Sequence, residues 1–210
     1  MPGAPLCEAC ARALPATDAP TCLRCGHPWA HEVPTCAECP AGVAWARHAA
    51  PYDPVLARVI SAMKDSGRRA LGAPLARLMV DRIPAPPSGA VLVPVPLSPA
   101  RLRERGFNQA GVLAAHLSRE WRAPVVNALV RPGDGRHQRG ASRGDRLGQV
   151  RDVFTCTAPA PHHAVLVDDV LTTGATVTAA ARALRGAGCA RVGVVVTARV
   201  VLASGRTRVG

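Results

Sequence analysis

Short apolar runs alternate with amphipathic stretches along most of the chain. Apolar runs that are too short for a helix and rich in Val and Leu predict buried strands at residues 90–96, 125–130, 164–167 and 190–198. Apolar residues at helical spacing predict two helices between residues 53 and 83, a third that ends near Trp121, and a fourth over 177–185. Strands and helices in this alternation predict an α/β domain with a mostly parallel sheet and helices on both faces.

Residues 164–176 join one predicted strand to one predicted helix through polar residues. Asp168 and Asp169 close the strand, and the sequence Thr-Thr-Gly-Ala-Thr at 172–176 leads into the helix. Backbone N–H groups, hydroxyls and the helix dipole at such a turn favour a bound phosphate, and ligands of open α/β sheets bind at this edge. A simple capped turn is the alternative interpretation, because Asp and Thr are also ordinary helix caps.

The same run resembles the phosphoribosyl-pyrophosphate (PRPP) motif of the type I phosphoribosyltransferases. The resemblance implies that Asp168 and Asp169 bind the ribose 2′- and 3′-hydroxyls. It also implies a site for the 5′-phosphate made of Thr172, Thr173, Gly174, Ala175 and Thr176. The chemistry agrees, because carboxylates accept hydrogen bonds from vicinal hydroxyls whereas threonines and free N–H groups donate to phosphate.

A second loop of these enzymes, which follows an earlier strand, binds pyrophosphate. By the resemblance this loop is residues 96–101 here, and Arg101 and Arg105 are the candidates that neutralise the leaving pyrophosphate. Lys64 lies in the basic connection between the first two predicted helices, where it is either a ligand contact or part of a solvated turn.

Six of the eight cysteines form three Cys-x-x-Cys pairs within the first 40 residues. In a reducing compartment such clustering indicates a metal site, and two pairs supply four thiolates for one structural Zn²⁺. The preferred ligands are Cys22, Cys25, Cys36 and Cys39, since Gly26 allows the tight turn after Cys25. Cys7 and Cys10 are alternatives that replace one pair or belong to a larger double ribbon. We therefore expect a zinc ribbon over residues 1–45 and a phosphoribosyltransferase-like domain over 46–210.

The chain also resembles the ComF family, which is associated with competence. The resemblance rests on the cysteine pairs, on Pro94-Val95-Pro96 at a strand end, on Arg-Gly-Phe-Asn-Gln at 105–109, and on the PRPP motif. It implies an N-terminal zinc module, which could also cover the acceptor base, and a link to natural transformation and DNA uptake. Two functions stay open: transfer of a 5-phosphoribosyl group from PRPP, with Mg²⁺, to an unidentified acceptor, or non-catalytic binding of single-stranded DNA or a nucleotide.

The positive net charge of the chain favours polyanionic partners, but it does not distinguish between these two functions. The chain of 210 residues carries a formal charge of +12, and its first 46 residues carry −2. The basic residues 131–151 could close over PRPP, hold a nucleic-acid backbone or form an ordinary solvated loop. Aromatic residues make up only 3% of the chain, which leaves few platforms for stacked bases. No long apolar run and no signal peptide are evident, so we expect a cytoplasmic protein without membrane insertion.

Overall fold

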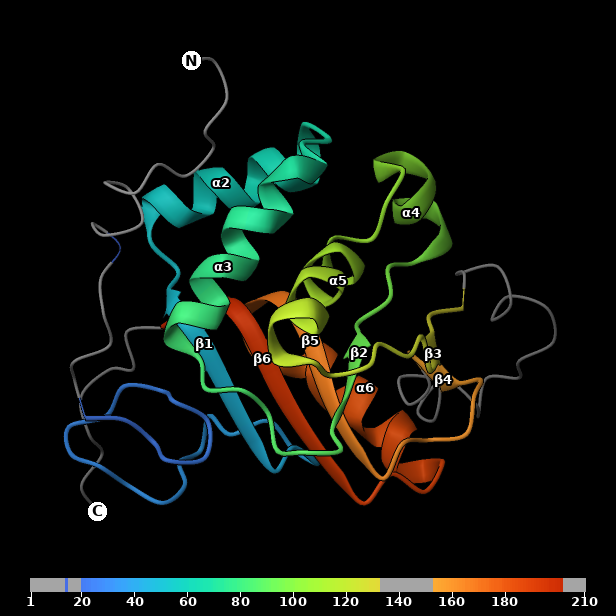
Figure 1. Cartoon of the computed structure of the whole chain (residues 1–210). Helices are drawn as coiled ribbons and strands as arrows, with labels where there is room; N and C mark the ends of the chain where they lie inside the picture. The colour runs from blue at the N-terminus through green and yellow to red at the C-terminus, as the bar shows by residue number, and fades with distance from the viewer. Residues whose placement is uncertain (1–13, 15–19, 133–152, 202–210) are drawn as a thin grey trace, which may run out of the picture.

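Four parallel strands form the central sheet of the protein (Figure 1). The computed structural model describes residues 14, 20–132 and 153–201. The strands are β1 (Trp45–Pro51), β2 (Val91–Pro94), β5 (His163–Leu171) and β6 (Arg191–Arg199). Their spatial order is β1-β6-β5-β2, and each neighbouring pair is parallel. The carboxyl ends of all four strands therefore meet at one edge.

Helices cover both faces of this sheet, as the sequence predicted. On one face lie α2 (Pro54–Asp65), the short 3₁₀ turn η1 (Arg69–Leu71), α3 (Gly72–Arg82) and α5 (Gln109–Trp121); α6 (Ala175–Gly186) lies on the other (Figure 1). α3 contacts β1 and β6, α5 contacts β5 and β2, and α6 contacts β5 and β6. The helix α4 (Pro99–Arg105) follows β2 beyond its carboxyl end.

Alternate residues of β5 divide between the two layers of the core. Val165 and Val167 join the apolar cluster under α2, α3 and α5, whereas Ala164 and Leu166 join the cluster under α6. Both faces of the strand are buried, which explains why its sequence is a continuous apolar run and not an alternating one. Cys22 and Cys25 belong to the α6-side cluster, so the cysteine segment packs against the sheet domain.

The observed elements differ from the predicted ones in three places. β5 continues through both aspartates to Leu171, so the carboxylates lie within the strand instead of closing it. Residues 125–130 do not form one strand, because Val125 makes a single parallel bridge to Leu92. Farther on, β3 (Leu129–Val130) pairs with β4 (Thr155–Cys156) in a separate antiparallel ribbon.

The third difference is that residues 96–101 are not one loop. Ser98 caps α4 by accepting a hydrogen bond from the Arg101 amide, and Pro99 suits the first helical position, so a helix begins inside the predicted loop. Gly106, with φ of +74°, ends that helix and separates it from α5. Most of the basic segment 131–151 lies outside the described residues. None of the helices in the described ranges has the length and apolar character needed to cross a membrane.

Candidate ribose-phosphate and metal sites

The loop between β5 and α6 has the geometry of an anion site. Gly174 is the N-cap residue of α6, and its φ of +78° lies in the left-handed region that favours glycine. The side-chain hydroxyl of Thr173 accepts a hydrogen bond from the Ala175 amide. The loop residues Thr172, Thr173, Ala175 and Thr176 are exposed, whereas Gly174 is buried. The helix N-terminus and three threonine hydroxyls therefore stand open to a ligand at the carboxyl edge of the sheet.

The two aspartates before this loop have different surroundings. They are adjacent residues of a strand, so their side chains point to opposite faces of the sheet. Asp169 is buried, and its carboxylate forms an ion pair with the Lys64 ammonium at the end of α2. Asp168 is half-buried, and one carboxylate oxygen accepts a hydrogen bond from the Asp169 amide at 2.9 Å. Lys64 therefore lies in the last turn of α2 and pairs with a buried carboxylate, so it is not a residue of a solvated turn.

Asp168 of this carboxylate pair holds its proton unusually tightly. Burial, followed by the negative charge of Asp169, raises the pKa of Asp168 well above its ordinary value, and Lys64 acts in the opposite direction. Such a pair gains most from a ligand that brings hydrogen-bond donors and a cation, because both favour the ionised carboxylates.

The two candidate arginines lie in different environments. Arg105 is mostly buried; it donates to the Gln109 side-chain oxygen at 3.1 Å and lies 4.0 Å from the Asp65 carboxylate. A cavity of about 140 Å³ lies between the end of α2 and the end of α4. It is lined by Lys64, Asp65, Gly67, Glu104 and Arg105. Arg101 lies exposed on α4. The structure therefore places Arg105 on the same cavity as Lys64, the residue that pairs with the Asp169 carboxylate. Arg101 remains on the surface.

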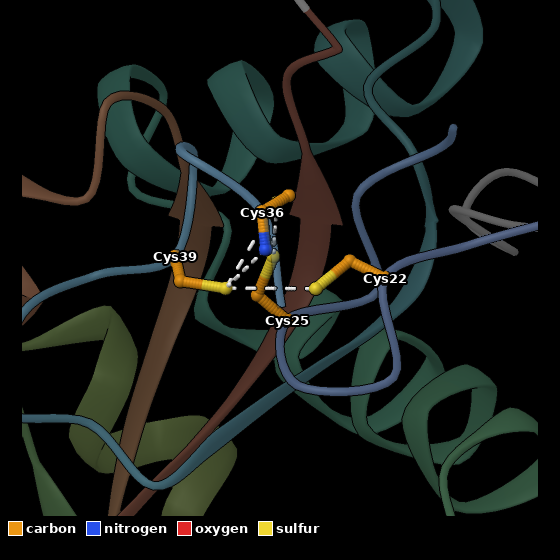
Figure 2. A group of neighbouring side chains, drawn as sticks. All are labelled: Cys22, Cys25, Cys36 and Cys39. Carbon is orange, nitrogen blue, oxygen red and sulfur yellow. Dashed lines mark hydrogen bonds between the residues drawn. The ribbon is translucent and has the colours of Figure 1, made fainter. Parts of the chain in front are cut away.

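Four cysteines from two separate turns form one cluster (Figure 2). Their sulfur atoms all lie within 4.8 Å of one another, and Sγ–Sγ distances are 3.5 Å for Cys22 and Cys39, 3.6 Å for Cys25 and Cys36, and 3.9 Å for Cys36 and Cys39. Four thiolates around one zinc ion, each about 2.3 Å from it, would stand about 3.8 Å apart. The cluster therefore fits a tetrahedral metal such as zinc, as the sequence predicted for these residues. Cys7 and Cys10 lie outside the described residues.

The protons of this cluster are unevenly held. Burial raises the pKa of the Cys36 thiol to about 11 and raises that of Cys25 further. Burial also opposes ionisation of Cys39, but hydrogen bonds from the Cys36 amide and the Thr35 hydroxyl outweigh it and lower its pKa to about 7. Cys39 is thus the most easily ionised of these three thiols, whereas the charge of a bound metal ion would help Cys25 and Cys36 to release their protons.

A buried arginine ties this cluster to the end of the sheet. Arg199, the last residue of β6, donates to the Cys25 carbonyl at 3.0 Å and to the Glu38 carbonyl at 3.4 Å. Its positive charge, 2% exposed, lies beside a site that would carry net negative charge with four thiolates around one zinc ion. The guanidinium therefore both positions the two cysteine turns and offsets their charge.

Comparison with known proteins decides the family. The family model of the phosphoribosyl transferase domain matches residues 142–206. The DNA utilization protein YhgH of Escherichia coli K12 is 32% identical over 201 residues, which cover 89% of this chain and 87% of that protein. Competence protein F of Haemophilus influenzae is 37% identical over 102 residues (46% of this chain, 44% of that one). Competence protein ComFC of Bacillus subtilis is 37% identical over 94 residues (45% and 38%). The chain belongs to the ComF family.

The Arg-Gly-Phe-Asn-Gln sequence that suggested the ComF family has a clear structural role. Asn108 caps α5 by accepting from the Ala110 amide, and its side-chain nitrogen donates to the Val95 carbonyl at 3.0 Å. Gln109 orients the Arg105 guanidinium. The sequence alone assigns no role to Asn108 or Gln109, although the polar pair directly after Phe107 is a signal for a helix start.

Proposed function

We propose that this ComF-family protein binds PRPP as its Mg²⁺ complex and transfers the 5-phosphoribosyl group to an acceptor that the sequence does not name. One observation carries the proposal: the carboxylate pair of β5 leads directly into a Gly/Thr loop at the N-terminus of α6, on the carboxyl edge of a parallel sheet. The phosphoribosyl transferase domain model matches this same part of the chain.

In this proposal, separate groups of residues bind the 5′-phosphate, the ribose and the pyrophosphate of PRPP. Residues 172–176 bind the 5′-phosphate through hydroxyls and helix N–H groups, and Asp168 and Asp169 accept from the ribose hydroxyls. Arg105 faces the leaving pyrophosphate, because it lies on the cavity that also contains Lys64; Arg101 contributes from the exposed face of α4. Mg²⁺ enters with the substrate and neutralises part of its pyrophosphate charge. Binding and electrostatic stabilisation of the leaving group are the contributions of the protein.

Calorimetric titration of Mg²⁺-PRPP tests this function. The zinc-loaded wild type is compared with Asp168→Asn/Asp169→Asn. Asp81→Asn serves as the control, because it removes a carboxylate charge from the exposed end of α3, away from the site. We expect binding by the wild type and by Asp81→Asn, and a loss of at least about tenfold in affinity in the double variant, since two charge-assisted acceptors disappear. Absence of binding by folded, zinc-loaded wild type contradicts the proposal.

Binding of single-stranded DNA is the second candidate function. The relatives' names refer to DNA utilization and competence, and the charge of +12 suits a polyanion. Binding through backbone phosphates should weaken by orders of magnitude between about 50 and 200 mM salt. Binding of Mg²⁺-PRPP that depends on the two aspartates and changes little with salt favours the transferase function instead.

The cysteine cluster completes the proposal as a structural site. We propose that residues 1–45 form a zinc-binding module and residues 46–210 the phosphoribosyltransferase-like domain, with β1 starting at the boundary. All six cysteines of the described residues are free thiols, which fits the reducing cytoplasm as the place of action.

A further inference from the structure

The cysteine segment packs directly on the phosphate-binding loop. Pro40, which follows the ligand Cys39, is buried. A Cβ atom placed on Gly174 would lie 3.1 Å from the Pro40 Cγ and 3.3 Å from its Cβ. One Cβ placed on Gly42 would contact Ala181 and Arg185 of α6 at 3.7 and 3.8 Å. Residues 40–42 thus cover the loop glycine and run along the helix whose N-terminus binds the phosphate.

The position of Pro40 depends on the sulfur cluster. Its neighbour Cys39 donates its amide to the Cys36 carbonyl at 3.2 Å, and its sulfur lies 3.5 Å from that of Cys22. The Glu38 carbonyl, two residues before Pro40, accepts from Arg199. A metal bound to four sulfurs would fix Cys39 from one side, and Arg199 fixes the turn from the other. Without the metal, only weak contacts between thiols hold the Cys39 turn on the side of the sulfur cluster.

We propose that metal binding at the four-cysteine cluster and phosphate binding at residues 172–176 are energetically coupled through the contact of Pro40 with Gly174. The metal-loaded turn holds Gly174 in its left-handed conformation and so keeps the hydroxyls and N–H groups of the loop in their binding arrangement. Loss of the metal releases Pro40 and weakens phosphate binding. The inference rests on the proposed function, and it makes zinc occupancy a regulator of the PRPP site. Coupling of this kind is reciprocal, so the substrate tightens zinc by the same factor.

Pro40→Gly in the zinc-loaded protein is the central variant, because it removes the ring and leaves all four ligands. Pro34→Gly is the matched control, since this exposed proline belongs to the same segment and gives the same gain in chain freedom. We expect about tenfold weaker Mg²⁺-PRPP binding in Pro40→Gly, with zinc content of one ion per chain in both variants. Equal PRPP affinity of Pro40→Gly and wild type overturns the coupling.

The reciprocal measurement separates coupling from a merely structural role. Zinc affinity is determined by equilibrium competition with a chromogenic chelator, with and without saturating Mg²⁺-PRPP. Saturation should tighten zinc binding about tenfold in the wild type and leave it unchanged in Pro40→Gly. The variant Asp168→Asn/Asp169→Asn is the control for direct binding of zinc by PRPP. This variant lacks the PRPP site, so any effect of Mg²⁺-PRPP on its zinc affinity comes from PRPP that binds zinc in solution. An unchanged zinc affinity of the wild type contradicts the inference.

Amide hydrogen exchange keeps the two proposals distinguishable. Exchange at residues 172–178 should be faster in zinc-loaded Pro40→Gly than in Pro34→Gly or wild type, in the absence of any substrate. Failure of wild type to bind Mg²⁺-PRPP refutes the proposed function alone. Exchange in the loop that is the same in all three proteins refutes the coupling, whatever ligand the loop binds.

Discussion

Replacing Lys64 by methionine removes the cation that pairs with the buried Asp169 carboxylate while keeping most of the side-chain volume. The Asp169 side chain is 6% exposed and the Lys64 side chain 23% exposed. Breaking a fully buried pair by removing one partner costs about 3–5 kcal/mol. Because water reaches almost a quarter of Lys64 and screens part of the attraction, we expect the free energy of unfolding to fall by about 2 kcal/mol.

Urea unfolding of the zinc-loaded protein at pH 7 measures this loss, and a double-mutant cycle with Asp169→Asn isolates the pair. The expected coupling energy is about 1–2 kcal/mol. The control cycle uses Arg77 and Asp81, an ion pair one helix turn apart on α3 with side chains 67% and 49% exposed. That surface pair should contribute at most about 0.5 kcal/mol. A Lys64–Asp169 coupling no larger than that of the control pair would refute the reasoning.

Three further predictions concern other parts of the protein. Cys36→Ser should reduce zinc content below one ion per chain by elemental analysis, whereas Cys189→Ser, a buried cysteine outside the cluster, should retain it; equal contents would contradict the assignment of the metal site. Burial lowers the pKa of His48 from 6.5 to about 4, so its contribution to stability is complete above pH 6.5 and is lost as the pH falls towards 4. Across that interval the wild type should lose about 2 kcal/mol more unfolding free energy than His48→Gln, and parallel curves would exclude the effect. Asn108→Ala removes a helix cap and the hydrogen bond to the Val95 carbonyl, which directly follows β2. It should cost about 1–2 kcal/mol in urea unfolding, whereas Asn127→Ala, at an exposed position, should cost little; similar costs would contradict the role of Asn108.

The sheet and the loop after it could be predicted from local sequence. The apolar run before Asp168 is buried on both faces, and such a short continuous run is typical of a strand in a parallel sheet. The residues of the phosphate loop are contiguous, so the sequence alone places them together. The four preferred cysteines also converge, because their spacing limits them to two short turns.

Contacts between distant segments could not be predicted in the same way. The Lys64–Asp169 ion pair joins α2 to β5, and Pro40 reaches Gly174 across more than half of the chain. The type of residue does not predict either contact, since lysine is usually solvated and proline usually marks a turn. The start of α4 at Pro99 differs from the predicted loop, because Ser98-Pro99 suits a turn as well as a helix cap followed by a first helical position.

A crystal structure of the zinc-loaded protein with Mg²⁺-PRPP tests the central claim most directly. The account predicts the 5′-phosphate at residues 172–176, the ribose hydroxyls at Asp168 and Asp169, and the pyrophosphate on the side of Arg105. Phosphate density elsewhere on the protein, with the loop of residues 172–176 free of ligand, would contradict it.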